Sequence, residues 1–279
     1  MEQETPQPET PNIPKKLVSV SEITAYMFCP RKLWLQKVKG IREPPSKEMI
    51  LGGMKHKSLE LFTNYEKEFI TQIPKDLPKS ELDQAYHELM RKCAIKAYQS
   101  NRNVAEKFDI ILTTFLAEFL PTTEREIAIR IPPLLEAMKS YIGLELWNNL
   151  KPKYKSEVSI ESEDLGIKGR IDRVEFSDSI LFSEDIIPYE IKTREQEKIW
   201  DSDKIQLAAY ALLLENRFRK KIPMGIIELR HSKKQIEITE ELKAQVLEIA
   251  DKVRNLQGEM PSSFSKCQSC KLKQDCLDN

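Results

Sequence analysis

The spacing of hydrophobic residues changes near residue 154. From about 46 to 150 they recur at the interval expected of amphipathic α-helices. From 154 to 239 they alternate with polar residues in short runs, as in strands that bury one face. The pattern predicts a helical first half and a second half built around a sheet.

The sequence shows clearly where the first helices of this half begin and end. Ser19 and Glu22 have capping-box spacing and predict a helix that runs towards Phe28. Cys29-Pro30 interrupts it, because proline disfavours helical backbone in the residue before it. A second amphipathic stretch follows and ends near Gly40. The residues that it offers to the core are Leu33, Trp34 and Val38.

Prolines divide the rest of this half. Helices are expected around 104–120 and 124–150, with a break at Pro121, since proline removes a helix hydrogen bond. Pro132 and Pro133 predict a helix start or a kink.

The second half predicts a mixed sheet. Residues 154–176 read as two antiparallel strands joined by a turn at E-D-L-G, and 186–193 as a third strand. Residues 204–215 predict a helix, and M-G-I-I-E-L-R with K-Q-I-E-I-T predicts a hairpin. Thr239 caps a last helix that closes at Gly258. The expected fold class is α+β (mixed α/β), with a central sheet flanked by helices.

The composition excludes a strong overall positive charge. Lysine plus arginine equals aspartate plus glutamate at 44 each, so any nucleic-acid contact must be local. Basic stretches at 31–42, 217–221 and 230–234 could neutralise phosphates, although each also fits a solvated edge.

The proline-rich, acidic residues 1–17 predict a disordered tail rather than a targeting peptide. Without an apolar run long enough to span a bilayer, a cytoplasmic protein is expected.

The stretch P-Y-E-I-K-T-R-E, residues 188–195, raises a chemical question. In a strand, Glu190 and Lys192 share one face, with their Cα atoms about 7 Å apart. An ion pair explains this arrangement, and so does a metal site. The tripeptide alone favours the ion pair, because E-x-K is common by chance.

Asp172 makes a metal site more attractive. It lies in the strand G-R-I-D-R-V-E-F, and strand pairing could bring its carboxylate to that of Glu190. Two close carboxylates repel unless a divalent cation neutralises them. Mg²⁺ or Mn²⁺ there would bind a phosphate oxygen and lower the pKa of a bound water, while Lys192 orients that water or stabilises negative charge.

Further residues are candidates for the same place. Gln206 and Tyr210 lie four apart on one face of the helix after this strand, although an amphipathic helix alone explains them. His56 follows Gly52 and Gly53, which permit close backbone approach, and it would serve as a third metal donor.

The cysteines carry an independent signal. Cys267, Cys270 and Cys276 lie in a short tail with almost no apolar residues that could hold it folded otherwise. A fourth thiolate would come from Cys29 or Cys93, and Cys29 is favoured because an interrupted backbone wraps a cluster more readily. Disulfides do not suit an intracellular chain, and spacing alone slightly favours zinc over iron and sulfur.

Taken together, the motifs resemble the RecB-like branch of the PD-(D/E)xK nucleases, and within it the CRISPR-associated exonucleases with a four-cysteine iron-sulfur cluster. The resemblance covers residues 19–62 and 154–276. The matching segments, in order, are S-E-I-T-A-Y-M-F-C-P-R-K, G-G-M-K-H, G-R-I-D-R-V, P-Y-E-I-K, Q-L-A-A-Y and C-x2-C-x5-C.

The resemblance implies roles for these residues. His56, Asp172 and Glu190 would bind the catalytic Mg²⁺ or Mn²⁺, and Lys192 would be the catalytic lysine. Gln206 and Tyr210 would belong to the motif helix beside the active site. The cluster, [4Fe-4S] or else [2Fe-2S], would be held by Cys29, Cys267, Cys270 and Cys276, and Cys93 would be a spare core thiol.

The implied organisation is a restriction-endonuclease-like core with an enlarged helical subdomain, because 115 residues separate His56 from Asp172. The expected segments are a tail (1–17), the first part of a cluster module (18–45), the helical subdomain (46–153), the nuclease core (154–260) and a cysteine segment (261–279).

The implied activity is metal-dependent exonucleolytic cleavage at single-stranded DNA ends, which processes precursors in CRISPR spacer acquisition beside the integrase proteins. Two alternatives stay open: a recombination or repair nuclease of the same superfamily, and a non-catalytic DNA-binding protein with structural zinc.

Overall fold

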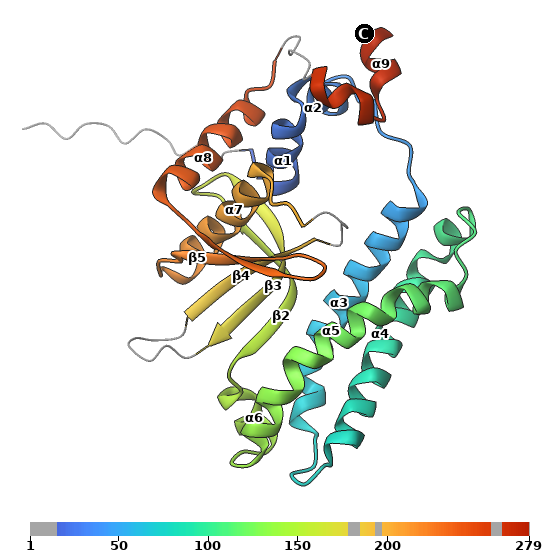
Figure 1. Cartoon of the computed structure of the whole chain (residues 1–279), viewed down its shortest axis with the longest axis vertical. Coiled ribbons are helices and arrows are strands. Elements are labelled where there is room, and N and C mark those ends of the chain that lie inside the picture. The colour runs from blue at the N-terminus through green and yellow to red at the C-terminus, as the bar shows by residue number, and fades with distance from the viewer. Residues whose placement is uncertain (1–15, 178–184, 193–196, 258–263, 279) are drawn as a thin grey trace, which may run out of the picture.

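The computed structural model describes residues 16–177, 185–192, 197–257 and 264–278 (Figure 1). The predicted tail falls almost entirely outside the described residues. In chain order the elements are β1 (Val18–Ser19), α1 (Val20–Phe28), α2 (Pro30–Lys37), α3 (Lys47–Thr71), α4 (Lys79–Glu106), α5 (Leu112–Met138), α6 (Gly143–Asn149), β2 (Lys153–Ser162), β3 (Ile167–Ser177), β4 (Asp185–Ile191), α7 (Asp201–Phe218), β5 (Met224–Glu228), β6 (Lys233–Glu237), α8 (Glu240–Arg254), the short 3-10 helix η1 (Phe264–Ser269) and α9 (Lys273–Asp278).

A mixed sheet forms the centre of the second half, as predicted. β2 and β3 form an antiparallel hairpin, and β4 pairs antiparallel with β3. β5 lies parallel to β4 after the crossover through α7, and β6 returns antiparallel to β5. The two-residue strand β1, which the sequence did not predict, pairs parallel with the start of β3. The start of α1 is thereby tied to the strand that carries Asp172.

The predicted helix ends around the sheet are largely correct. Ser19 and Glu22 form the capping box of α1, and the side chain of Thr239 caps α8. α8 ends at Arg254, and the predicted stop at Gly258 lies outside the described residues.

Helix α7 packs directly on the sheet, where it contacts β2, β3, β4 and β5, and α1 and α8 pack against it (Figure 1). The packing is tight at Gly225 in β5, where an added Cβ would lie 2.8 Å from a side-chain carbon of Leu207. Because glycine has no Cβ, α7 can seat on the sheet and carry its polar residues to the ends of β3 and β4.

Helices α3 to α6 form a separate group beside the sheet (Figure 1). Their buried apolar residues make a cluster of their own, distinct from the cluster under α1, α7 and α8. Helices α3 to α6 therefore have their own hydrophobic core, and α3 joins it to the sheet by packing against β2.

The expected break at Pro121 is wrong, because α5 continues from Leu112 to Met138 through Pro121, Pro132 and Pro133. The three prolines lie on its exposed or half-buried side, while the opposite face stays buried from Phe115 to Met138. Burial along that face outweighs the lost backbone hydrogen bonds. No helix within the described residues is long and apolar enough to cross a bilayer.

Val38 is also not where it was expected. Leu33 and Trp34 are buried, but Val38 is 51% exposed because α2 ends at Lys37. Its predicted place in the core is wrong.

Buried charges connect the two halves. Arg173 of β3 is fully buried, and it contacts Glu126 of α5 at 2.5 Å and Glu228 of β5 at 2.8 Å. Arg130 of α5 pairs with Glu126 and, at 2.9 Å, with Glu66 of α3. Since Arg173 follows Asp172, and neighbours in a strand face opposite ways, this network holds the back of the strand whose front carries Asp172.

Candidate active site

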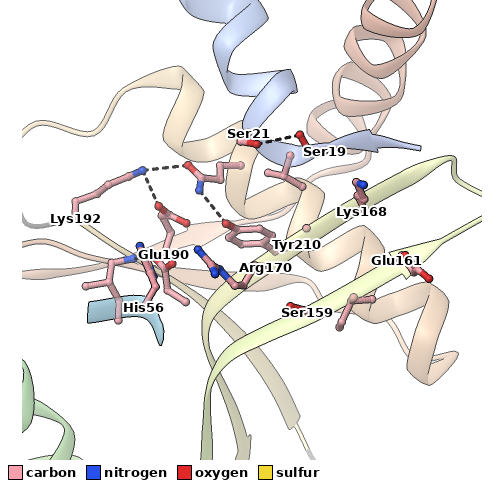
Figure 2. A pocket seen from close by; sticks show the side chains of 16 residues that line it. Ser19, Ser21, His56, Ser159, Glu161, Lys168, Arg170, Glu190, Lys192 and Tyr210 are labelled. Atoms are coloured by element: carbon pink, nitrogen blue, oxygen red, sulfur yellow. Dashed lines mark hydrogen bonds and ion pairs between the residues drawn. The ribbon is translucent and has the colours of Figure 1, made fainter. Parts of the chain in front are cut away.

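A pocket of about 1010 Å³ lies where α1, α3 and α7 meet β2, β3 and β4 (Figure 2). It contains every residue that the sequence nominated for binding the catalytic Mg²⁺ or Mn²⁺ or for catalysis. The walls include His56, Asp172, Glu190, Lys192, Gln206 and Tyr210.

The end of β4 holds the acid and the amine on one side. Lys192 Nζ lies 2.6 Å from Glu190 Oε1 and donates to Gln206 Oε1 at 3.0 Å (Figure 2). Gln206 in turn donates to the Tyr210 hydroxyl at 2.9 Å, so the two α7 residues anchor the lysine from the helix side. Asp203, also from α7, lies 3.4 Å from the amine.

The electrostatics of this side favour a cation. Burial lowers the pKa of Lys192, but contact with Glu190 outweighs burial and the pKa is raised. Burial, and then the charge of Asp172, raise the pKa of Glu190 to about 8, and the contact with Lys192 does not overcome them. Lys192 is therefore a cation near neutral pH, while burial and mutual repulsion disfavour ionisation of both carboxyls together unless a further cation is present.

Asp172 faces the same pocket from β3. Its Oδ2 accepts a hydrogen bond from the backbone N–H of Ile191 at 2.8 Å, which fixes the distance between β3 and the end of β4. Burial raises the pKa of Asp172 as well. The predicted convergence of the acids from these two strands is present in the structure.

The group of potential metal ligands that the described residues bring together differs from the predicted one. His56, Glu157 and Asp172 each offer a ligand atom within 4.8 Å of the other two. Glu190 does not belong to this group, and its Oε1 is held by Lys192. The structure thus brings His56 and Asp172 together as expected and adds Glu157, which the sequence reasoning missed.

A signal for Glu157 was present in the sequence. The turn at 163–166 sets the register of the β2–β3 hairpin, in which Ser156 pairs with Arg173 and Val158 with Ile171. Glu157 therefore lies opposite Asp172, and cross-strand partners share a face of the sheet. Counting back from the turn would have identified it.

One carboxylate oxygen in particular indicates that a cation fits here. Oε2 of Glu190 is buried without a hydrogen-bond partner, whereas Oε2 of Glu157, which also has no hydrogen bond, has the guanidinium of Arg170 at 3.1 Å. Buried carboxylate oxygens almost always have a partner, and hard oxygen donors are the ligands that Mg²⁺ and Mn²⁺ prefer. The donor set therefore suits a divalent cation.

The expectation for Gly52 and Gly53 is not met. An added Cβ at either position would have no atom within 4 Å among the described residues. Neither glycine is needed there for close packing of protein against α3.

The four nominated cysteines line a second pocket of about 340 Å³, formed by the start of α2 and the C-terminal segment. Arg31 Nε donates to Cys276 Sγ at 3.1 Å. No disulfide joins the cysteines of the described chain, and Cys93 lies apart in the core of the helical group. Four thiols in one small pocket suit a metal ion or an iron-sulfur cluster.

A sheet whose adjacent strands present Asp172 and the E-x-K segment to one pocket is the arrangement of a PD-(D/E)XK nuclease. A family model of the PD-(D/E)XK nuclease superfamily matches residues 17–277, and the chain belongs to this superfamily.

Among curated proteins, the chain is 33% identical over 156 residues to a CRISPR-associated exonuclease Cas4/endonuclease Cas1 fusion from Leptospira interrogans serogroup Icterohaemorrhagiae serovar Lai (strain 56601). The match covers 49% of this chain and 28% of the length of that relative. The solved structure of SSO0001 matches with a TM-score of 0.30 and 21% identity, covering 55% of this chain and 76% of that one.

Proposed function

We propose that this protein is a divalent-metal-dependent deoxyribonuclease that cleaves phosphodiester bonds at single-stranded DNA ends, as an exonuclease of CRISPR spacer acquisition. The observation that supports the activity best is the convergence of Asp172, Glu190 and Lys192 in one pocket with His56 and Glu157 beside them. The related Cas4/Cas1 fusion favours the CRISPR pathway over recombination or repair.

His56, Asp172 and Glu190 would hold the cation, which supplies Lewis-acid activation of the phosphate and of a water. The chain itself supplies charge and orientation. Lys192 stays protonated, so it acts as a cation that stabilises negative charge developing on the phosphate. Gln206 holds the Lys192 amine at 3.0 Å, and Tyr210 holds Gln206, so the amine is positioned before DNA binds.

Cys29, Cys267, Cys270 and Cys276 would hold an iron-sulfur cluster, with [4Fe-4S] as the preferred type. The second pocket supports this assignment, because its thiols come from residues more than two hundred positions apart in the chain. A cluster there would join the two ends of the chain beside the nuclease core.

The decisive experiment is cleavage of end-labelled single-stranded DNA with Mg²⁺ or Mn²⁺ by the wild type and by Asp172→Asn. The substitution keeps the side-chain shape and removes the charge, so folding is preserved and cleavage is lost. Asp164→Asn, in the exposed turn of the same hairpin, is the matched control and cleaves at the wild-type rate. Full activity in purified Asp172→Asn would refute the assignment.

The Leptospira relative also supports a protein partner for this chain. We expect a separate CRISPR integrase chain of the Cas1 type to bind this protein, because the two modules share one chain in the Leptospira relative. Size-exclusion chromatography of the mixture tests this, and elution of two separate peaks at micromolar concentrations would count against it.

A further inference from the structure

Glu157 has an unusual backbone conformation in the middle of β2. Its φ is +56°, in the left-handed region that non-glycine residues seldom adopt. Such a conformation costs about 1–3 kcal/mol and persists where the surroundings impose it. The residues around Glu157 must therefore hold it in place.

Helix α3 provides that constraint through two residues, Thr63 and His56, that make polar contacts with β2. The Thr63 hydroxyl accepts from the Ser156 N–H at 3.0 Å and donates to the Ser156 carbonyl at 2.9 Å. Nearly two turns earlier on the same helix, His56 Nδ1 lies 2.7 Å from Glu157 Oε1. The contacts to Ser156 and Glu157 thus hold α3 and β2 in a fixed position relative to each other.

The Glu157 carboxylate is almost completely enclosed, with a side-chain exposure of 2%, while that of His56 is 41%. Its Oε2 has an ion pair with Arg170 Nε at 3.1 Å but no hydrogen bond. A carboxylate oxygen of Asp172, on the neighbouring strand, lies within 4.8 Å of the Glu157 carboxylate, and two like charges at that distance repel. A buried acid beside a second acid is unfavourable by itself, which points to a role for Glu157 in the site.

We propose that Glu157 is a positioning residue that orients His56 for a divalent cation. Nδ1–H of the imidazole donates to Glu157 Oε1, which leaves Nε2 as the nitrogen available to the cation. A carboxylate behind a metal-binding histidine fixes its tautomer and ring orientation, and its loss weakens metal affinity about 10–100-fold. This inference rests on the metal site of the proposed function and concerns how that site is built.

A double-mutant cycle on Mn²⁺ affinity tests the role. Isothermal titration calorimetry without DNA gives the Mn²⁺ Kd of the wild type, Glu157→Gln, His56→Ala and the double variant. Because Glu157 acts through His56, Glu157→Gln weakens binding about 10–100-fold in the wild type and adds little in the His56→Ala background. Glu163→Gln, an exposed residue in the turn after the same strand, leaves the Kd unchanged.

A spectroscopic readout separates positioning from general destabilisation. Electron spin-echo modulation of bound Mn²⁺ reports coupling to an imidazole nitrogen, which is present in the wild type, absent in His56→Ala and reduced in Glu157→Gln. Urea unfolding checks that each variant is folded at the assay temperature.

Three outcomes would overturn the proposal: an unchanged Kd in Glu157→Gln, a full imidazole signal in that variant, or multiplicative losses in the double variant. Multiplicative losses would make Glu157 a ligand in its own right. If the cycle behaves as expected but no DNA is cleaved, the nuclease assignment fails and the role of Glu157 stands.

Discussion

Glu126 joins the buried ion pairs of the helical group (α3 to α6) to those of the sheet. It contacts Arg130 on its own helix and Arg173 on β3, and the Ser156 hydroxyl donates to it at 3.0 Å. The substitution Glu126→Gln keeps the shape and removes the charge. We expect it to destabilise the protein strongly, because two buried guanidinium groups each lose one of their carboxylates.

The expected loss in stability depends on the ion pairs that the two arginines keep. Arg173 keeps Glu228 at 2.8 Å, and Arg130 keeps Glu66 at 2.9 Å, so neither cation is left without any acid. Breaking a buried ion pair by removing one partner costs about 3–5 kcal/mol. With each arginine still partly neutralised, the loss in the free energy of unfolding should lie at the lower end of that range.

The effect depends on pH in a defined direction. Burial alone would raise the pKa of Glu126, but Arg173 and Arg130 outweigh burial and hold it at about 2. A carboxyl with a lowered folded-state pKa stabilises the protein above its unfolded pKa and loses that contribution as the pH falls towards the folded value. The difference between the wild type and Glu126→Gln should be full at pH 7 and shrink steadily below about pH 4.5.

Urea unfolding followed by circular dichroism, from pH 7 down to pH 3, measures this difference. The matched control is Glu124→Gln on the same helix, where Glu124 pairs with His87 at the surface and is worth at most about 1 kcal/mol. A loss below about 1 kcal/mol for Glu126→Gln at pH 7, or a difference that does not change with pH, would refute this account of the network.

Two further predictions concern packing and the cysteines. Gly225→Ala should destabilise by about 1–3 kcal/mol in urea unfolding, since the new Cβ would lie 2.8–2.9 Å from Leu207 carbons. Gly53→Ala, a helical site with open space, should instead stabilise by up to about 1 kcal/mol, and equal effects would contradict the packing argument. Cys29→Ala should abolish the iron content and visible colour of anaerobically purified protein, while Cys93→Ala keeps both. Retention of iron in Cys29→Ala would remove that residue from the ligand set.

The local features of this protein could be predicted from its sequence. The capping box at Ser19, the hairpin with its turn at 163–166 and the alternation that places Glu190 with Lys192 depend on residues close together in the chain. Short-range signals of this kind act through backbone geometry, which a single sequence specifies well. The six pocket residues were nominated from short motifs, and their roles come from the resemblance of those motifs to a nuclease family; the structure brings the six to one pocket.

The tertiary structure decided what depends on contacts between distant segments. α5 continues through Pro121 because its opposite face is buried, and no local signal reports that burial. His56 meets Glu157, and Arg173 meets Glu126, across 101 and 47 positions of the chain. Long-range pairs of this kind are set by how helices dock on the sheet, and the free energy of docking comes from burial that exists only once the chain has folded.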